Sequence, residues 1–253
     1  MKVFLTGASS GIGEALARHY AAQGATLGLF ARREAALARI ASETAPATVA
    51  TYAGDVRDAD ALARAGADYL ERFGTPDIVI ANAGVSRGTL TEEPDDLPAF
   101  RAVFDTNVLG IVHTFAPFLA AMRRERHGVL VGVASVAGFR GLPGSGAYSA
   151  SKAAAITYLE SLRVEQVGTG VSVVTICPGF IATPMTAQNP YRMPFLIQPE
   201  KAARLIARAI AQRRRRYVLP WQMALLDPAL RAMPGFLFDA AFARSKRKPR
   251  QVD

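Results

Sequence analysis

Cysteine, histidine and long apolar runs are all scarce in this sequence. The 253 residues include one cysteine, Cys177, and three histidines, His19, His113 and His127. A single cysteine excludes an internal disulfide, and these scattered groups supply no metal-ligand cluster, so we expect no metal and a reducing, cytoplasmic location. Since no apolar run reaches about 18–20 residues, no membrane span is predicted. The first predicted strand already begins at Lys2, so we expect no signal peptide.

Acidic residues are too few to balance the basic ones, and the excess lies at the end of the chain. The net charge is +9, and residues 213–253 carry +7 of it. The body of the protein is therefore nearly neutral. In the tail, apolar residues gather at 221–226 and 236–242. A nucleic-acid arm would instead interleave stacking side chains with basic ones, so we expect no nucleic-acid partner.

Apolar runs alternate with helical patterns along most of the chain. Strands are predicted at 2–6, 25–30, 48–53, 77–81, 128–134 and 171–176, and helices at 14–24, 34–40, 58–73, 97–122 and from 147 onward. Nearly continuous apolar strands that alternate with helices specify a parallel sheet covered on both faces. No internal repeat, low-complexity run or linker interrupts the pattern. We therefore predict a single α/β domain, a doubly wound Rossmann-type parallel sheet flanked by helices.

A glycine-rich turn joins the first predicted strand to the first helix. Gly7, Gly11 and Gly13 occupy this turn in the order G-x-x-x-G-x-G, which departs from the general G-x-G-x-x-G fingerprint. Glycines in this setting let backbone N–H groups approach a pyrophosphate at a helix N-terminus. The position of the turn, more than its spacing, favours nucleotide binding.

Two arginines follow the second predicted strand. A dinucleotide site commonly places a carboxylate at this point, where it binds a free ribose 2′-hydroxyl. Arg32 and Arg33 stand here instead, and a guanidinium suits a 2′-phosphate. The alternative is that both simply begin the next helix in solvent; we favour the phosphate.

A tyrosine and a lysine four residues apart lie on one predicted helix. Tyr148 and Lys152 then share a helical face, and a nearby ammonium holds a phenol closer to ionisation. Ser135, at the end of an apolar strand, could hold a substrate oxygen. Any long helix offers such a pair by chance, so its meaning depends on the other motifs.

Taken together, these motifs resemble the short-chain dehydrogenase/reductase family over roughly residues 2–220, in an NADP-preferring form with a C-terminal extension. The matching segments, in order, are 6–13 (TGASSGIG), 55–56 (DV), 82–84 (NAG), Asn107, Ser135, 148–152 (YSASK) and 178–183 (PGFIAT). The resemblance implies an NADP(H)-dependent oxidoreductase that interconverts a carbonyl and a secondary alcohol. It also implies a homodimer or homotetramer.

The family's catalytic residues map onto four positions. By resemblance, Tyr148 is the acid in reduction and the base in oxidation, and Lys152 lowers its pKa and holds the nicotinamide ribose. Ser135 would fix the carbonyl oxygen, and Asn107 would hold a water that links Lys152 to solvent. Hydride chemistry belongs to the cofactor, so the protein supplies position and a proton.

The resemblance also implies a set of residues that line the cofactor. Besides Tyr148 and Lys152, they are Gly7, Ser9, Ser10, Gly11, Ile12, Gly13, Arg32, Arg33, Asp55, Val56, Asn82, Ala83, Gly84, Pro178, Ile181 and Thr183. Some NADP-preferring members carry a basic residue just before the second glycine, where this chain has Ser10. Arg32 would therefore carry most of the preference, assisted by Arg33.

The motifs leave the substrate open. Residues 184–198 mix apolar side chains with one charge, Arg192, and predict an apolar covering segment over a hydrophobic ketone or alcohol. Arg192 could meet an anionic group. The alternative to an enzyme is a catalytically silent NADP(H)-binding sensor or scaffold, which would not need all four catalytic residues. Cys177 is expected to be a buried small residue.

The chain is predicted to divide into a catalytic domain, residues 1–220, and an apolar and basic extension, residues 221–253. The four residues after Arg216 predict a last edge strand, and two short helices broken at Pro234 and Gly235 would follow. These helices would pack over the substrate cleft or a subunit interface. Alternatively, they lie on an anionic membrane surface and make the enzyme membrane-peripheral.

Overall fold

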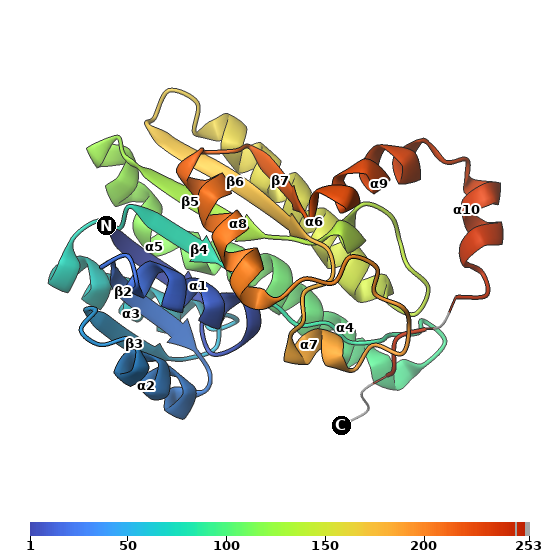
Figure 1. The fold of residues 1–253 in the computed structure, drawn as a ribbon, viewed down its shortest axis with the longest axis horizontal. Coiled ribbons are helices and arrows are strands. Elements are labelled where there is room, and N and C mark those ends of the chain that lie inside the picture. The colour runs from blue at the N-terminus through green and yellow to red at the C-terminus, as the bar shows by residue number, and fades with distance from the viewer. Residues whose placement is uncertain (246, 251–253) are drawn as a thin grey trace.

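A computed structural model describes residues 1–245 and 247–250, and its centre is a parallel sheet (Figure 1). The sheet order is β3-β2-β1-β4-β5-β6-β7, and every neighbouring pair is parallel. The strands are β1 (Lys2–Thr6), β2 (Thr26–Ala31), β3 (Val49–Ala53), β4 (Ile78–Ala81), β5 (Gly128–Val133), β6 (Val171–Pro178) and β7 (Arg216–Leu219). The predicted doubly wound sheet is confirmed, and the order reverses beside β1, where such folds bind ligands.

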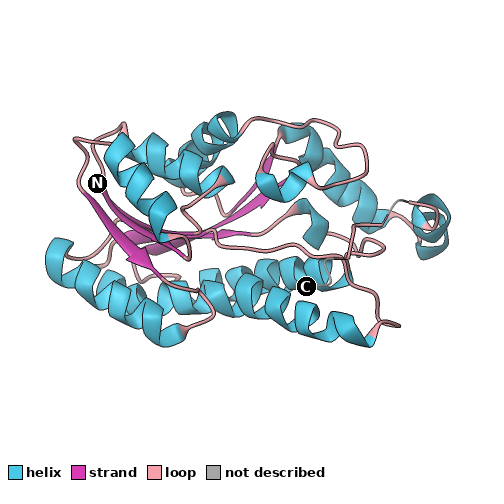
Figure 2. Ribbon diagram, turned by 90° about the horizontal axis from the view of Figure 1, so that it is seen from below, coloured by secondary structure: helices cyan, strands magenta, loops and turns pink. Residues whose placement is uncertain are grey.

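Helices cover both faces of the sheet (Figure 2). One layer contains α1 (Gly11–Ala21), α2 (Glu34–Glu43) and α8 (Pro199–Ala211), and the other contains α3 (Ala59–Phe73), α5 (Gly110–Glu125) and α6 (Gly146–Glu165). Strand side chains alternate between the two layers: Val3 and Leu5 join the first apolar core, and Phe4 joins the second. Both faces of β1 are therefore buried, which explains its unbroken apolar sequence.

The helical stretch predicted at 97–122 is confirmed, but a π-helical turn interrupts its α-helical geometry. It consists of α4 (Leu97–Phe104), a π-helical turn (Asp105–Leu109) and α5, preceded by a short 3₁₀ turn (Pro94–Asp96). Such π-turns occur frequently at functional sites, and this one carries Asn107. By length and composition, Pro94–Glu125 is apolar enough to cross a membrane. Its side chains Phe115 and Phe118 are instead buried in a core of this protein.

The C-terminal extension forms α9 (Trp221–Ala232) and α10 (Gly235–Phe242), which project beside the sheet (Figure 1). Ion-pair and hydrogen-bond contacts fasten α9 to the body, and the Arg140 guanidinium lies 4.2 Å from the centroid of the Phe238 ring on α10. Arg216 pairs with Asp227 at 2.6 Å, and Arg140 Nη1 donates to the carbonyl oxygens of Leu230 and Met233 at 2.7 and 3.0 Å. The predicted helix break at Pro234 is present. Of the predicted basic tail, Lys246 and residues 251–253 lie outside the described residues.

Candidate active site

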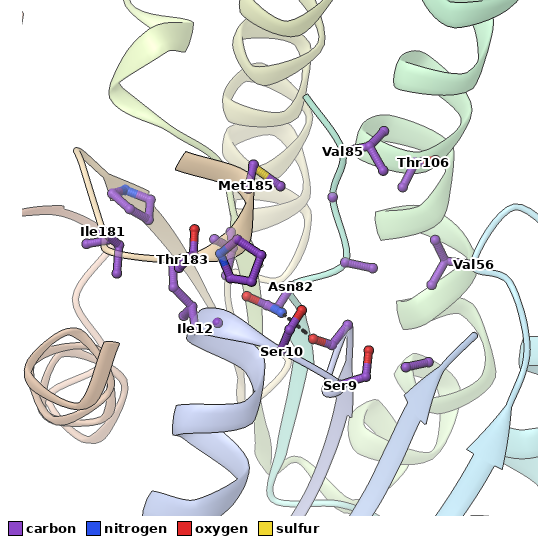
Figure 3. A pocket seen from close by; sticks show the side chains of 18 of the residues that line it. Ser9, Ser10, Ile12, Val56, Asn82, Val85, Thr106, Ile181, Thr183 and Met185 are labelled. Atoms are coloured by element: carbon purple, nitrogen blue, oxygen red, sulfur yellow. Dashed lines mark hydrogen bonds between the residues drawn. The ribbon is translucent and has the colours of Figure 1, made fainter. Parts of the chain in front are cut away.

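One cleft opens at the carboxyl ends of the strands and is lined by nearly all the predicted site residues. Figure 3 shows part of this lining, with Ser10 and Asn82 on one side of the cleft and Val56 and Thr106 on another. Those lining it are Gly7, Ser9, Ser10, Gly11, Ile12, Arg32, Arg33, Asp55, Val56, Asn82, Ala83, Gly84, Ser135, Tyr148, Lys152, Pro178, Ile181 and Thr183. Gly13 and Asn107 are the two predicted residues that do not line it. Both instead pack against residues that line it: Gly13 against Gly7, and Asn107 against Val85.

The glycine turn packs so tightly that side chains are excluded. Gly7 has φ +69°, and a Cβ atom there would lie 2.7 Å from Ala83 Cα. A Cβ on Gly13 would lie 2.1 Å from the carbonyl oxygen of Gly7. The Asn82 side-chain amide donates to the carbonyl oxygens of Thr6 and Gly7, both at 3.2 Å. Gly13 thus acts from behind the cleft by letting the turn approach α1.

The turn delivers free backbone donors to the cleft. Ser10 is the N-cap of α1, and its side chain makes no capping hydrogen bond. The first N–H groups of a helix lack partners within the helix, and the helix dipole adds partial positive charge at this end. Here the glycines remove the side chains that would cover these groups. The cradle therefore fits a pyrophosphate, which is the part of a dinucleotide cofactor expected at this position.

The two predicted phosphate-binding arginines are held differently. Arg33 Nη2 donates to the carbonyl oxygen and the hydroxyl of Ser9, at 3.0 and 3.1 Å, so its guanidinium is tied to the glycine turn. Arg32 remains 65% exposed, and its Nη1 atom lies 4.0 Å from Asp55 Oδ2. Of the two, Arg32 has the guanidinium that is freer to meet a ligand.

Asp55 is engaged by a neighbour that the sequence did not single out. Arg57 donates to both Asp55 carboxylate oxygens, with Nη2 to Oδ2 at 2.8 Å. Burial acts to raise the pKa of this carboxyl, but the hydrogen bonds from Arg57 and the nearby charge of Arg32 together lower it. Asp55 therefore stays ionised, and its carboxylate lies at the edge of the cleft between Arg32 and Arg57.

Lys152 is buried beneath Tyr148. Its Nζ atom donates to the carbonyl oxygen of Val133 at 2.9 Å and lies 5.9 Å from the centroid of the Tyr148 ring. Burial lowers the pKa of this ammonium to about 8. The predicted sharing of one helical face is confirmed by this geometry, and the cation is held at the wall of the cleft by a strand carbonyl.

The pKa of Tyr148 moves in the direction opposite to the one expected from Lys152. Burial raises it, and a hydrogen bond with Ser135 opposes the rise without cancelling it. Ser135 Oγ itself accepts from the N–H of Ala137 at 3.1 Å, which fixes the hydroxyl at the start of a 3₁₀ turn. Desolvation of the phenol outweighs the neighbouring groups, so Tyr148 keeps its proton at neutral pH.

Asn107 is fully buried and bridges two segments behind the cleft. Its Oδ1 atom accepts from Val85 N–H at 2.8 Å, while Nδ2 donates to the Val85 carbonyl at 2.9 Å and to Ser151 Oγ at 3.0 Å. A Cβ atom on Gly84 would lie 3.2 Å from Asn107 Oδ1 and 3.4 Å from Lys152 Nζ. The two polar groups therefore converge on one point beside Gly84.

The structure adds the lining residues Val85 and Thr106, which the sequence did not reveal. Met185 and Thr186 also line the cleft and belong to the segment 184–198 that was predicted to cover the substrate. Thr106 precedes Asn107 in the π-helical turn, whose presence no local pattern signalled. Thr186 is different: its hydroxyl accepts from Thr183 N–H at 3.0 Å in a capping box, and the T-x-x-T spacing is visible in the sequence.

The segment predicted to cover the substrate, residues 184–198, begins with the short helix α7 (Pro184–Ala187). Tyr191 packs against Phe180, with 6.3 Å between the ring centroids, and its electrostatic effect contributes to the raised pKa of Tyr148. Arg192 is exposed at the surface. The segment 184–198 thus influences the catalytic candidate Tyr148 through the side chain of Tyr191.

The remaining sequence candidates have structural roles. Cys177 is completely buried, as predicted, and burial raises the pKa of its thiol to about 11. His113 Nδ1 lies 2.9 Å from the Val56 carbonyl oxygen, and His127 pairs with Asp77. Within residues 1–245 and 247–250, no group of three or more His, Cys, Asp or Glu side chains could hold a metal ion.

Comparison with known proteins agrees with the fold described above. A family model described as short chain dehydrogenase matches residues 1–193. An uncharacterised oxidoreductase of Myxococcus xanthus is 42% identical over 243 residues, which make up 95% of each chain.

Two further similarities concern proteins of named activity. The 11-beta-hydroxysteroid dehydrogenase 1A of Arabidopsis thaliana is 38% identical over 187 residues, which are 73% of this chain and 53% of the plant protein. The chain therefore matches about half the length of that relative. The solved structure of an alcohol dehydrogenase from the archaeon Thermococcus sibiricus, complexed with 5-hydroxy-NADP, has a TM-score of 0.78 at 28% identity. That match covers 86% of this chain and 95% of the other.

Proposed function

The chain belongs to the short-chain dehydrogenase family of oxidoreductases, and from this premise we propose that it interconverts a hydrophobic ketone and its secondary alcohol with NADP(H). One observation carries the proposal. Ser135, Tyr148 and Lys152 line the same cleft as the phosphate cradle at the start of α1. A nicotinamide dinucleotide held by that cradle could extend along the cleft toward the three side chains.

The cofactor would be held by residues from several strand ends. The N-terminus of α1 would bind the pyrophosphate, Asp55 and Val56 would flank the adenine, and Lys152 would bind the nicotinamide ribose. When bound, the cofactor supplies or accepts the hydride. The protein's own residues supply position and the proton.

Tyr148 would transfer its phenolic proton to the carbonyl oxygen during reduction, as hydride reaches the carbonyl carbon, and would take that proton back during oxidation. A raised pKa keeps the phenol protonated at neutral pH, which suits a proton donor. The Ser135 hydroxyl, fixed by the N–H of Ala137, would donate to the same oxygen as negative charge develops there. The phenolate would then be stabilised by the ammonium of Lys152.

Reprotonation of Tyr148 needs a route to solvent. Asn107 Oδ1 and Lys152 Nζ converge beside Gly84, and both are polar groups that a water molecule could join. We assign Asn107 this positioning role through the π-helical turn. Its other hydrogen bonds, to Val85 and Ser151, hold the amide in a single orientation.

The preference for NADP(H) would rest mainly on Arg32. Its exposed guanidinium stands at the end of β2, where a ribose 2′-phosphate would lie, and Arg33 is already committed to Ser9. The archaeal alcohol dehydrogenase of similar fold is complexed with 5-hydroxy-NADP, which is consistent with this assignment.

The substrate would be largely apolar. Met185 lines the cleft, and Met185, Phe195 and Leu196, all on the segment 184–198, are large hydrophobic side chains that are nevertheless exposed. Exposed apolar side chains that gather at a cleft are typical of a binding site for an apolar ligand. The name of the plant relative, a hydroxysteroid dehydrogenase, fits an apolar alcohol or ketone of this kind.

The test is a screen of NADPH oxidation over ketones of increasing apolar surface, from acetone to cyclic and polycyclic ketones. We expect kcat/KM to rise with the apolar area of the ketone, and NADH to support less activity than NADPH. NADPH binding without turnover of any ketone or alcohol would favour the alternative, a silent sensor or scaffold. Equal activity with both cofactors would overturn the role of Arg32.

A further inference from the structure

The end of the described chain returns from α10 to the mouth of the active site. Residues 247–250, here called the C-terminal strap, lie against the loop that follows β4 (Figure 1). The backbones of Gly88 and Arg250 form a parallel bridge. A Cβ on Gly88 would lie 2.5 Å from the carbonyl oxygen of Lys248, and a Cβ on Gly144 would lie 2.7 Å from Arg247 Cβ. The strap therefore contacts the loops on both sides of the mouth.

An ion-pair cluster anchors the end of the strap. Arg250 Nε donates to both carboxylate oxygens of Asp96, at 3.1 and 2.9 Å, and Arg250 Nη2 lies 3.1 Å from Glu93 Oε2. Asp96 is buried and also accepts from Leu90 N–H at 2.7 Å. A buried carboxylate with these partners is a specific attachment and not a chance surface contact.

Lys248, two residues earlier, has no acidic partner among the described residues. Its Nζ atom donates to Ser86 Oγ at 2.6 Å and lies 5.9 Å from the centroid of the Tyr148 ring. The side chain is half-buried, and among residues 1–245 and 247–250 no carboxylate pairs with it. Arg250 thus has two acidic partners, whereas the half-buried Lys248, beside the active-site tyrosine, has a neutral hydroxyl as its described partner.

Burial of an ammonium is costly, and it lowers the pKa of Lys248. No carboxylate of residues 1–245 or 247–250 offsets this cost. An anion from outside the chain would remove this cost. Ser86 adjoins Val85, which lines the cleft, so the ammonium lies next to the substrate end of the site. Arg192, which the sequence analysis suggested as a partner for an anionic group, is exposed and therefore lacks the partial burial of Lys248.

We propose that Lys248 and Ser86 form an anion-binding subsite at the substrate mouth, so that the preferred substrates are apolar ketones or alcohols that carry a carboxylate. This inference rests on the proposed oxidoreductase function. The carboxylate would accept hydrogen bonds from the Lys248 ammonium and the Ser86 hydroxyl. The apolar part of the substrate would contact the segment 184–198, and its carbonyl would face Tyr148.

Binding to the full chain saturated with NADP⁺ tests the subsite without requiring turnover. The probes are octanoate and octanamide, which differ in charge but hardly in shape, and the measurement is calorimetric titration. The wild type should bind octanoate at least ~10-fold more tightly than octanamide, since a charged hydrogen bond is involved. Lys248→Met should remove that difference. Arg244→Met, which removes an exposed charge from the same tail, should retain it.

A second variant displaces the strap and leaves Lys248 in the chain. Gly88→Ala places a methyl group 2.5 Å from the Lys248 carbonyl oxygen and should also remove the preference for octanoate. Gly146→Ala is the matched control, because its added methyl group meets open space. Unchanged octanoate binding in Lys248→Met, or equal binding of the two probes by the wild type, would overturn the proposal.

Turnover separates this inference from the function on which it rests. The comparison uses a ketone that carries a carboxylate and its methyl ester. Reduction of both with equal kcat/KM would retain the proposed function and reject the anion subsite. Selective octanoate binding through Lys248 without reduction of any ketone would retain the subsite and reject the proposed reaction.

Discussion

The ammonium of Lys152 donates a hydrogen bond to the carbonyl oxygen of Val133, 2.9 Å away, at the last residue of β5. This bond ties the helix that carries Tyr148 to the strand that leads to Ser135. The cation is buried, and its pKa falls to about 8. At neutral pH Lys152 is therefore charged although burial disfavours the charge, and this lowers the free energy of unfolding.

Replacing Lys152 should change how stability depends on pH. Below pH 8 both the folded and the unfolded states carry the proton, and the folded state bears the cost of a buried charge. Between pH 8 and 10.5 the unfolded state binds more protons, so wild-type stability rises with pH relative to a Lys152→Met variant. The difference in unfolding free energy, variant minus wild type, should be about 2 kcal/mol larger at pH 7 than at pH 9.5.

Urea unfolding at the two pH values measures this difference, and comparing variant with wild type cancels the other titrating groups. Lys201→Met, at an exposed position on α8, is the control substitution. A Lys152→Met difference that stays constant with pH would mean that the buried ammonium carries no such cost.

Arg32→Asp should weaken NADPH binding. The change replaces a guanidinium at the end of β2 with a carboxylate that repels a 2′-phosphate. The lost charged hydrogen bond alone predicts at least a ~10-fold rise in the NADPH dissociation constant, with a relative gain for NADH. Fluorescence titration of both cofactors checks this, and Arg64→Asp, on an exposed position of α3, repeats the charge change elsewhere. The same NADPH affinity in both variants would contradict the assignment.

Gly13→Ala should abolish cofactor binding and destabilise the fold. Its methyl group would lie 2.1 Å from the Gly7 carbonyl oxygen and 2.6 Å from Asn82 Nδ2, so the turn must move away from α1. Overpacking of this kind typically costs about 1–3 kcal/mol. Thermal unfolding with and without NADPH reports both effects, and Gly146→Ala is the control. A Gly13→Ala protein that NADPH still stabilises normally would show that the turn is not the cradle.

The exposed face of α9 and α10 gives a prediction about membranes. Trp221 and Phe236 are 68% and 72% exposed, and Arg244 and Arg247 are exposed nearby in the sequence. Apolar side chains beside basic ones suit an anionic surface, where each basic residue contributes about 1 kcal/mol. We expect co-sedimentation with anionic vesicles at low salt, weaker with neutral vesicles and reduced by Trp221→Ser with Phe236→Ser. Absence of the wild type from the anionic pellet would exclude this contact.

The sequence predicted the elements whose causes are local. Apolar runs located all seven strands within a few residues, including the predicted last edge strand β7 (Arg216–Leu219). Most of these runs are unbroken because both faces of the central strands are buried. The tight turn at Gly7 and Gly13 was visible because only glycine tolerates such close backbone approach. The order of strands, helices and motifs along the chain then placed the cleft at the carboxyl ends of the strands.

Features that depend on distant contacts were not visible in the sequence. Lys248 meets Ser86 across 162 positions, and no local pattern indicates this pairing. The π-helical turn around Asn107 reads as ordinary helix, because its apolar spacing hardly differs. The raised pKa of Tyr148 is a consequence of burial in the folded site, whereas the sequence showed only the nearby lysine.

The most direct test of the proposed reaction is Tyr148→Phe, which removes the proton donor and keeps the ring. NADPH oxidation with the best ketone from the screen and NADPH affinity by fluorescence would be measured on wild type and variant together. We predict that kcat falls ~10²-fold or more while the NADPH dissociation constant stays within about twofold. A variant that reduces the ketone at a near-normal rate would contradict the role of Tyr148 as the acid and base of this site.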